Sequence, residues 1–289
     1  MSRALNRLPS GKRRKAVEGP AARPLGARST ATVGAPLSLA DLGRFEDAGI
    51  NASAPPQQRV LDGWLLRFSP GKAKRARCIN ALSTGRLPIS ERLALCELAY
   101  RQAELPMIVR ITPFSEPPLL DEKLAAVGLR RFDDTRVMVL PDLQALAGSA
   151  PVGLTLQAVS THAYAYAIGA LRDSPAGQRE AHAERLRHAP VRSSGFLLQR
   201  DGETLACGLY TVESDLVGLY DVFTAPAARD QGLARALCTA LLQRARAEGA
   251  RRAYLQVEGD NLAARAVYHR LGFADAYAYH YRTRDPEAT

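Results

Sequence analysis

The stretch Arg229-Asp230-Gln231-Gly232-Leu233-Ala234 lies between a strand-like stretch, residues 216–224, and a helix-like stretch, residues 233–248. A helix that begins directly after a loop presents unpaired backbone N–H groups and the positive end of its dipole, and both favour an anion. Because Gly232 has no side chain, a diphosphate can approach that backbone closely. The stretch therefore predicts a phosphate-binding loop between a strand and a helix.

A second pattern follows this loop. Residues 253–257 predict a short buried strand, and residues 261–271 predict a short helix that ends at a glycine. A short motif is informative when it lies on the expected elements in the expected order, as both patterns do here. The residues that carry the second pattern are Asn261, Ala264, Tyr268, Gly272 and Phe273.

Together the two patterns resemble the GNAT superfamily of N-acetyltransferases. The first is similar to the acetyl-coenzyme A pyrophosphate loop of that family, Arg-x-x-Gly-x-Gly/Ala, with Ala234 in the last position. The second is similar to the next family motif, Asn-x-x-Ala-x-x-x-Tyr-x-x-x-Gly-Phe. The resemblance implies an α/β fold with a mixed sheet, whose fourth and fifth strands splay apart and hold the thioester of acetyl-coenzyme A between them.

The order of elements in the second half agrees with such a fold. Asp201-Gly202 indicates a hairpin turn between two of the strands. The predicted strands are 154–158, 194–200, 203–213, 216–224 and 253–257, and two further strands follow the last helix. The predicted helices are 161–171, 177–188, 233–248 and 262–271.

The resemblance also implies which residues hold acetyl-coenzyme A, the expected cosubstrate. The backbone of the fourth strand would bond the pantetheine arm, and the loop with its two flanking arginines would bind the diphosphate. The implied coenzyme-binding residues are Val222, Phe223, Thr224, Arg229, Asp230, Gln231, Gly232, Leu233, Ala234, Arg235, Asn261, Ala264 and Tyr268.

Acetyl transfer to an amine requires a proton donor for the departing thiolate. Tyr268 is the candidate acid, because its phenol can donate a proton and its position matches the tyrosine that the family places beside the coenzyme thiol. The same spacing would let Tyr268 pack with Ala264 and Leu271 on an apolar helix face. Asn261 precedes a helix and is also a favoured N-cap.

The transfer also requires a base for the amine. Asp221 lies on the fourth strand and is the candidate, although strand alternation turns it away from the gap unless a bulge intervenes. Glu213 and Glu258 are alternatives, and ordered water is another. His280 is a candidate for the acceptor pocket, although an isolated histidine on a late strand is usually structural.

The chain also matches itself. Ala103-Glu104 lies 144 residues before Ala247-Glu248, and in the same register Gly128-Leu129 precedes Gly272-Phe273. Each half then reads as helix, buried strand, helix and a closing pair of strands. The sequence therefore predicts two tandem GNAT-like domains.

The first half lacks the residues of the coenzyme site. In the repeat register Pro88 stands where Gly232 stands and removes an N–H donor, and Leu124 replaces Tyr268. Residues 62–68 resemble the degenerate amino-terminal domain of some tandem bacterial GNAT proteins. We therefore expect a degenerate GNAT-like domain over residues 38–148 and a catalytic domain over residues 149–289. Trp64 is expected in the core of the first, or alternatively in the wall of the acceptor site.

Most of the net charge of +10 belongs to the amino-terminal arm. Eight of the first thirty residues are Lys or Arg and one is acidic, so the rest of the chain carries only +3. With few large apolar residues, the arm at 1–37 is predicted to be disordered. A basic arm can bind nucleic acid by counterion release, so binding of RNA or the ribosome is one alternative function, though a nucleic acid partner is not favoured. A non-catalytic acyl-coenzyme A sensor or scaffold is another.

Composition narrows the other function classes. No apolar run is long enough for a membrane span or resembles a secretion signal, so a cytoplasmic location without a membrane partner is expected. The four cysteines lack C-x-x-C spacing, which predicts buried free thiols and no metal site. The predicted activity is direct transfer of an acetyl group to a primary amine of a small molecule or peptide, and neither the acceptor nor the oligomeric state is specified.

Overall fold

The computed structural model describes residues 37–146 and 153–285, so the predicted disordered arm lies outside the described residues. The helices are α1 (Leu39–Ala52), α2 (Ile89–Gln102), α3 (Leu120–Ala126), α4 (Thr161–Leu171), α5 (Ala176–His188), α6 (Leu233–Ala247) and α7 (Leu262–Arg270), with 3-10 turns η1 (Lys74–Ala76), η2 (Leu143–Ala145) and η3 (Pro226–Ala228). The strands of the first half are β1 (Gln57–Leu61), β2 (Trp64–Phe68), β3 (Ile79–Ala81), β4 (Val109–Ile111) and β5 (Arg130–Leu140). Those of the second half are β6 (Thr155–Val159), β7 (Ser193–Arg200), β8 (Glu203–Glu213), β9 (Leu216–Thr224), β10 (Arg252–Glu258) and β11 (Ala274–Thr283).

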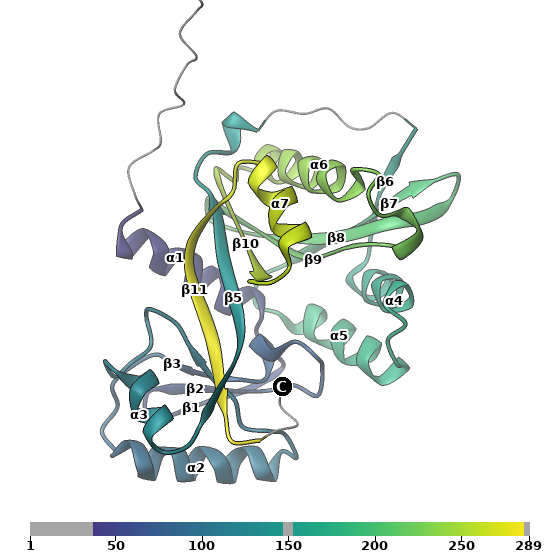
Figure 1. Ribbon diagram of the computed structural model, residues 1–289. Helices are drawn as coiled ribbons and strands as arrows, with labels where there is room; N and C mark the ends of the chain where they lie inside the picture. The colour runs from purple at the N-terminus through teal and green to yellow at the C-terminus, as the bar shows by residue number, and fades with distance from the viewer. Residues whose placement is uncertain (1–36, 147–152, 286–289) are drawn as a thin grey trace, which may run out of the picture. The chain divides into compact units, whose positions relative to one another are not determined.

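All these strands join one mixed sheet in the order β1-β2-β3-β4-β11-β5-β10-β9-β8-β7-β6 (Figure 1). The predicted mixed α/β fold is confirmed. Each half ends in one long strand, so the prediction of a closing pair of strands in each half is wrong. A single long strand closes each half because it pairs with strands of the other half: β5 with β10 and β11, and β11 with β4 and β5.

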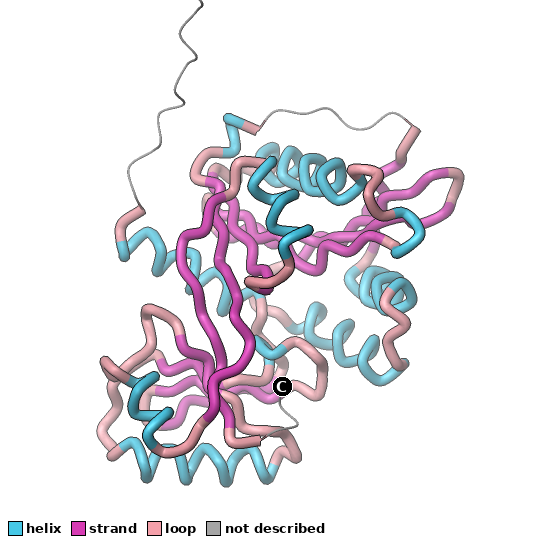
Figure 2. Tube along the Cα trace, in the orientation of Figure 1, coloured by secondary structure: helices cyan, strands magenta, loops and turns pink. Residues whose placement is uncertain are grey.

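The two long strands are exchanged between the halves. β5 pairs antiparallel with β10, from Ala253↔Leu140 to Glu258↔Thr135, and β11 pairs antiparallel with β4. β5 and β11 also pair with each other and run side by side through the structure (Figure 2). The last strand of each half therefore completes the sheet of the other half.

The backbone repeats with the spacing that the sequence predicts. α2 begins at Ile89 and α6 at Leu233, and β5 begins at Arg130 and β11 at Ala274, so both pairs of elements are 144 residues apart. β3 and β4 are parallel in the first half, as β9 and β10 are in the second. The predicted domain boundary at 148 and 149 stays a prediction, because it falls among the residues that are not described.

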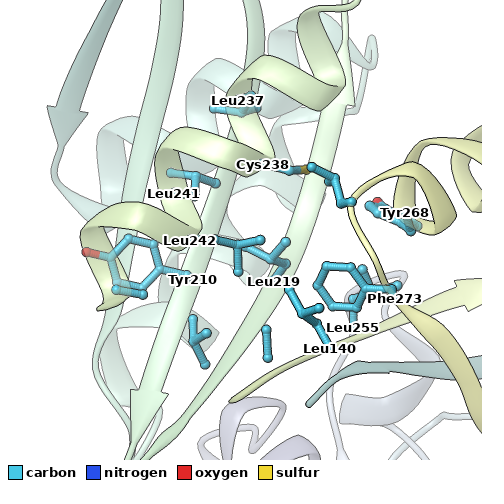
Figure 3. Close-up of a cluster of buried hydrophobic side chains, with 14 of the residues drawn as sticks. Leu140, Tyr210, Leu219, Leu237, Cys238, Leu241, Leu242, Leu255, Tyr268 and Phe273 are labelled. Carbon is cyan, nitrogen blue, oxygen red and sulfur yellow. The ribbon is translucent and has the colours of Figure 1, made fainter. Parts of the chain in front are cut away.

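The core of the second half is built on α6. Its apolar residues recur every three or four positions, so one face of the helix is buried against β8 and β9 (Figure 3). Leu237, Cys238, Leu241 and Leu242 are fully buried there. This packing fixes the start of α6, and with it the predicted phosphate-binding loop.

A separate cluster forms the core of the first half. Trp64 is fully buried, its Nε1 donates to the carbonyl of Glu116 at 3.2 Å, and the guanidinium of Arg92 lies 4.8 Å from its ring. The core role predicted for Trp64 is confirmed, and the alternative of a substrate wall is wrong. All four cysteines are buried, as expected.

The strand exchange predicts that the second half does not fold alone. A chain cut to residues 149–289 loses β5, whose residues 137–140 are all buried. Burial of four such side chains contributes roughly 6–12 kcal/mol, which is comparable to the whole stability of about 5–15 kcal/mol of a typical domain. Thermal unfolding followed by circular dichroism should show no cooperative transition for 149–289.

Co-expression of residues 37–148 with 149–289 is the matched control. The two pieces should associate and recover the cooperative transition of the full chain. A monomeric 149–289 that unfolds at the same temperature as the full chain would contradict the structural importance of the exchange.

Candidate functional site

The loop before α6 has the backbone geometry of an anion cradle. Gly232 is the N-cap of α6 with φ +73°, and Asp230 has φ +62°. This left-handed region strongly favours glycine, and a Cβ built at Gly232 would meet no atom within 4 Å. The constraint on Gly232 is therefore its backbone conformation and the open space in front of the loop.

The N–H groups of this loop are free. Within the described parts of the chain, the main-chain N–H groups of residues 231–235 donate to no acceptor, and no side chain caps the start of α6. Converging free N–H groups at the positive end of a helix dipole bind an anion such as a diphosphate. The loop therefore fits the diphosphate of a coenzyme. Leu233 differs from its neighbours because its side chain is buried in the core, so only its backbone can contribute.

The sheet opens between β9 and β10. Their parallel pairing extends only from Leu216↔Arg252 to Leu219↔Leu255, and the rest of β9 has no partner on that side. A register shift between β8 and β9 lies opposite Asp221, which has φ +50°. The bulge that was required to turn Asp221 is therefore present. The gap holds a cavity of about 340 Å³.

The predicted coenzyme residues fall into two groups around this gap. Val222, Asn261, Ala264 and Tyr268 line the cavity. The loop residues, which lie outside its lining, begin five residues after the end of β9. On β9 the main chain of residues 222–224 is unpaired on the side of β10, so it is free to bond an extended ligand as another strand would.

Tyr268 belongs to the core of the second half and also lines the cavity. It packs edge-on against Phe273, with ring centroids 6.1 Å apart (Figure 3). Its hydroxyl has no hydrogen-bond partner among the residues that the structure describes. Burial raises the pKa of Tyr268, so the phenol is a neutral proton donor. Asn261 has its expected capping role, because its Oδ1 accepts the N–H of Ala264 at 3.1 Å.

Asp221 is surrounded by cations. Its carboxylate lies 3.1 Å from Nε2 of His182, 3.4 Å from Nη1 of Arg172 and 3.9 Å from Nη2 of Arg185. Burial raises the pKa of Asp221, but the contact with His182 and the charges of Arg172 and Arg185 outweigh it and hold the pKa far below its ordinary value. A carboxylate stabilised in this way is a weak base. Its surroundings therefore favour a role in holding α4 and α5 against β9.

The other candidates for the base and the acceptor pocket lie in different places. Glu258 ends β10 and lines the cavity. Glu213 accepts from Nδ2 of Asn51 at 2.9 Å and does not line it. His280 contacts Asp121 of α3 at 2.7 Å and does not line the cavity, which agrees with the structural role and not with the alternative of an acceptor-pocket residue. The cause is strand exchange, which carries β11 beside the first half.

The sequence reasoning missed one wall of the cavity. This wall comes from η1 of the first half and from the exchanged strands, and it consists of Lys72, Ala73, Lys74, Arg75, Asp133, Thr135, Tyr279 and Tyr281. The alternation of Tyr277, Tyr279 and Tyr281 along β11 was the available signal for a shared buried face. Local patterns do not reveal that this face meets η1.

The corresponding loop of the first half is already occupied by a side chain. The carboxylate of Asp62 accepts the N–H groups of Arg86 and Leu87 at 2.9–3.0 Å. Its Oδ2 also lies 2.9 Å from Nη2 of Arg92, and Pro88 is the N-cap of α2. An internal anion thus accepts two N–H groups of this loop, which correspond to those of residues 230 and 231 before α6 in the 144-residue register.

Comparison with known proteins agrees with this geometry. The sequence model of the Acetyltransferase (GNAT) family matches residues 163–273. The second half of the chain is therefore similar in sequence to the GNAT acetyltransferase family. Uncharacterized N-acetyltransferase YobR of Bacillus subtilis is 26% identical over 241 residues, which cover 78% of this chain and 92% of that protein. Mycothiol acetyltransferase of Streptomyces avermitilis is 40% identical over 81 residues, 27% of this chain and 26% of that protein.

Solved structures of GNAT proteins share the fold. A GCN5-related N-acetyltransferase from Kribbella flavida has a TM-score of 0.65 at 19% identity and covers 84% of this chain and 95% of its own. A tandem GNAT protein from the clavulanic acid biosynthesis pathway has a TM-score of 0.54 at 17% identity, with 68% and 70% covered. The chain is thus an acyltransferase of the acetyl-coenzyme A-dependent class. Among residues 37–146 and 153–285, no helix is long and apolar enough to cross a membrane.

Gly232→Val should weaken the binding of coenzyme A at least about tenfold, or roughly 1.4 kcal/mol, because it strains the loop and fills the cradle. Calorimetric titration measures this affinity. Gly249→Val is the matched control, since Gly249 also has a positive φ and open space but lies beyond the other end of α6. Equal affinities of the two variants would contradict the cradle.

Asp221→Asn should lower the free energy of unfolding by about 2 kcal/mol at neutral pH, because Arg172 and Arg185 lose their counter-ion. A lowered pKa gives a contribution that is full above the unfolded-state pKa of about 3.9 and is lost as pH falls through the folded-state pKa. The difference from wild type, measured by urea unfolding, should therefore shrink as the pH falls below about 4.

Asp201→Asn is the control for this substitution. Asp201 has the same φ of +50° as Asp221 but is exposed in a hairpin turn, so the backbone contribution cancels. Equal stability changes in the two variants would show that the cations do not depend on Asp221.

Proposed function

We propose that the chain is an N-acetyltransferase that moves an acetyl group from acetyl-coenzyme A to a primary amine by direct attack, with both substrates bound together. The observation that carries this proposal is the cavity between the splayed β9 and β10. Tyr268 of α7 lines this cavity, and the loop before α6 presents N–H groups without acceptors in the described chain. The acceptor is a small molecule or a peptide amine. A cytoplasmic location and an independent role of the basic arm stay predictions.

The coenzyme would be held mainly by main chain. The N–H groups of residues 231–235 suit the diphosphate, and Arg229 and Arg235 are exposed at the edges of the loop. The free side of residues 222–224 suits the amide groups of the pantetheine arm. Because these are backbone roles, they depend on the bulge and on the αL glycine more than on side-chain identity.

In the transfer step, the amine nitrogen bonds to the thioester carbonyl carbon and the carbon–sulfur bond breaks. Tyr268 is the proposed donor to the sulfur, which its buried, neutral and unpartnered phenol supports. An ammonium loses two protons on becoming an amide. One balances the protonation of the thiol, and the other leaves toward solvent.

The proposed outlet for that second proton is Glu258. Of the three carboxylates considered, it lines the cavity and has no ion pair with the described residues. Asp221 is held in its charged form by cations and Glu213 lies elsewhere. Glu258 would take the proton directly or through water.

The first half is proposed to act without a coenzyme. The carboxylate of Asp62 already accepts two N–H groups of its loop, and Leu124 occupies the position of Tyr268. Its contribution is structural and steric, since it supplies β5 to the sheet and η1 to the cavity wall.

Tyr268→Phe should bind acetyl-coenzyme A with unchanged affinity and lower kcat about 10²-fold or more, because only the proton donor is lost. Release of free thiol with a panel of primary amines measures turnover, and calorimetry measures binding. An unchanged kcat would remove Tyr268 as the acid.

Tyr210→Phe is the matched control. Its hydroxyl donates to Glu248 and lies outside the cavity lining, so kcat should not change. Tight binding of acetyl-coenzyme A by the wild type without turnover of any amine would instead indicate a sensor.

A further inference from the structure

The cavity connects two different faces of the sheet. On β10, Leu255 and Val257 belong to the core beside α6 and α7, which also contains Tyr268. Strand alternation places Tyr254, Gln256 and Glu258 on the opposite face, where Tyr254 packs against Phe45 of α1. The amine must therefore approach from the face of Glu258 if the thiol is beside Tyr268, which rests on the function proposed above.

The ionic groups of the cavity are only partly neutralised among themselves. Lys74 pairs with Asp133 at 3.0 Å, and Arg172 pairs with Asp221 at 3.4 Å. Within the described chain, no ion pair involves the remaining charged lining residues. These are the cations Lys72 and Arg75 and the anion Glu258.

Arg75 is the best placed of the unpaired cations. Its Nη1 donates to the hydroxyl of Tyr279 at 3.3 Å, and that hydroxyl donates to Oε1 of Gln256 at 2.8 Å. Its Nε is buried and has no acceptor among the residues described. A part-buried guanidinium without a counter-ion is costly, and its planar donors match the oxygens of a carboxylate or a phosphate. The group is thus suited to an anion that arrives with a ligand.

Strand register relates the two unpaired charges. Glu258 pairs with Thr135 on β5, and Thr135 pairs with Tyr279 on β11. Paired residues share a face, so these three side chains form one row across the exchanged strands. Glu258 at one end and Tyr279 at the other are separated by two strand spacings, or roughly 10 Å. Arg75 contacts the hydroxyl of Tyr279 at 3.3 Å, so the lining of the cavity presents an unpaired negative group and an unpaired positive group around this row.

From this arrangement we infer that the acceptor is a small zwitterion, whose amine lies toward Glu258 and whose acidic group, a carboxylate or a phosphate, is bound by Arg75 with Lys72 nearby. A volume of about 340 Å³ suits a compact molecule of this kind. The first half of the chain thereby determines acceptor specificity through η1.

The test uses the full chain with acetyl-coenzyme A and matched amines. A series of α- and ω-amino acids is compared with the corresponding neutral amides, and O-phosphoethanolamine is compared with ethanolamine. For at least one pair, kcat/KM should be about tenfold or more higher for the acidic member, corresponding to one charge-assisted contact. The pair that shows the preference separates carboxylate from phosphate. Equal or better turnover of all the neutral members would overturn the inference while leaving the acetyltransferase function intact.

Arg75→Gln should remove this preference by raising KM for the acidic member about tenfold or more, with little change for its neutral match. Arg75→Lys should recover part of it. Arg101→Gln, an exposed position on α2, is the control and should change neither. An equal loss for both members of the pair would assign Arg75 a purely structural role and overturn the inference. If Arg75→Gln does not fold, Lys72→Gln at an exposed position takes its place, with a smaller rise in KM confined to the acidic member.

A second readout does not depend on turnover. Glutarate and inorganic phosphate, which carry no amine, are added separately to the wild type and to Arg75→Gln, with and without coenzyme A. One of the two anions should raise the thermal midpoint of the wild type and not that of the variant. Equal shifts in both would contradict the site at Arg75. Failure of coenzyme A to bind would instead contradict the proposed function, and the anion shift would still decide this inference.

Discussion

The structure depends on the antiparallel pairing of β5 with β11. Each strand is hydrogen-bonded on both edges, to its exchanged partner on one side and to a strand of the other half on the opposite side. Sheet formation in one half therefore requires the other half. The same pairing places Thr135 and Tyr279 beside Glu258, so the constraint that holds the fold together also builds one wall of the cavity.

The site has main-chain groups that no other strand or side chain of the described chain pairs with. The pairing of β9 with β10 stops at Leu219, just before the bulge that contains Asp221, and within the described chain the first N–H groups of α6 have no acceptor. Both features expose polar backbone that is normally satisfied within a fold, which is stable only where water or a ligand can take its place. The first half differs, because the carboxylate of Asp62 accepts two N–H groups of the equivalent loop and fills the place of an external anion there.

Charge is distributed so that neighbouring carboxylates have different roles. Asp221 is surrounded by His182, Arg172 and Arg185, and its lowered pKa makes it an anchor for two helices. Glu258 lies across the gap on β10 and has no ion pair with the described residues. Proximity to the cavity therefore does not by itself identify a base, since the surrounding cations decide whether a carboxylate can accept a proton.

The sequence alone determined the features that are local. The boundaries of α6 and β9, the loop before α6, the cap at Asn261 and the repeat of 144 residues follow from periodicity, turn chemistry and spacing within a few residues. The mixed fold and the place of Tyr268 in the cavity lining were implied by the resemblance of the two motifs to the GNAT family. Only the tertiary structure decided the exchange of β5 and β11, the cations around Asp221, the displacement of His280 and the approach of Arg75 to Tyr279. Each of these joins residues that are distant in the chain, and a local pattern specifies which face of an element is apolar but not which distant element covers it.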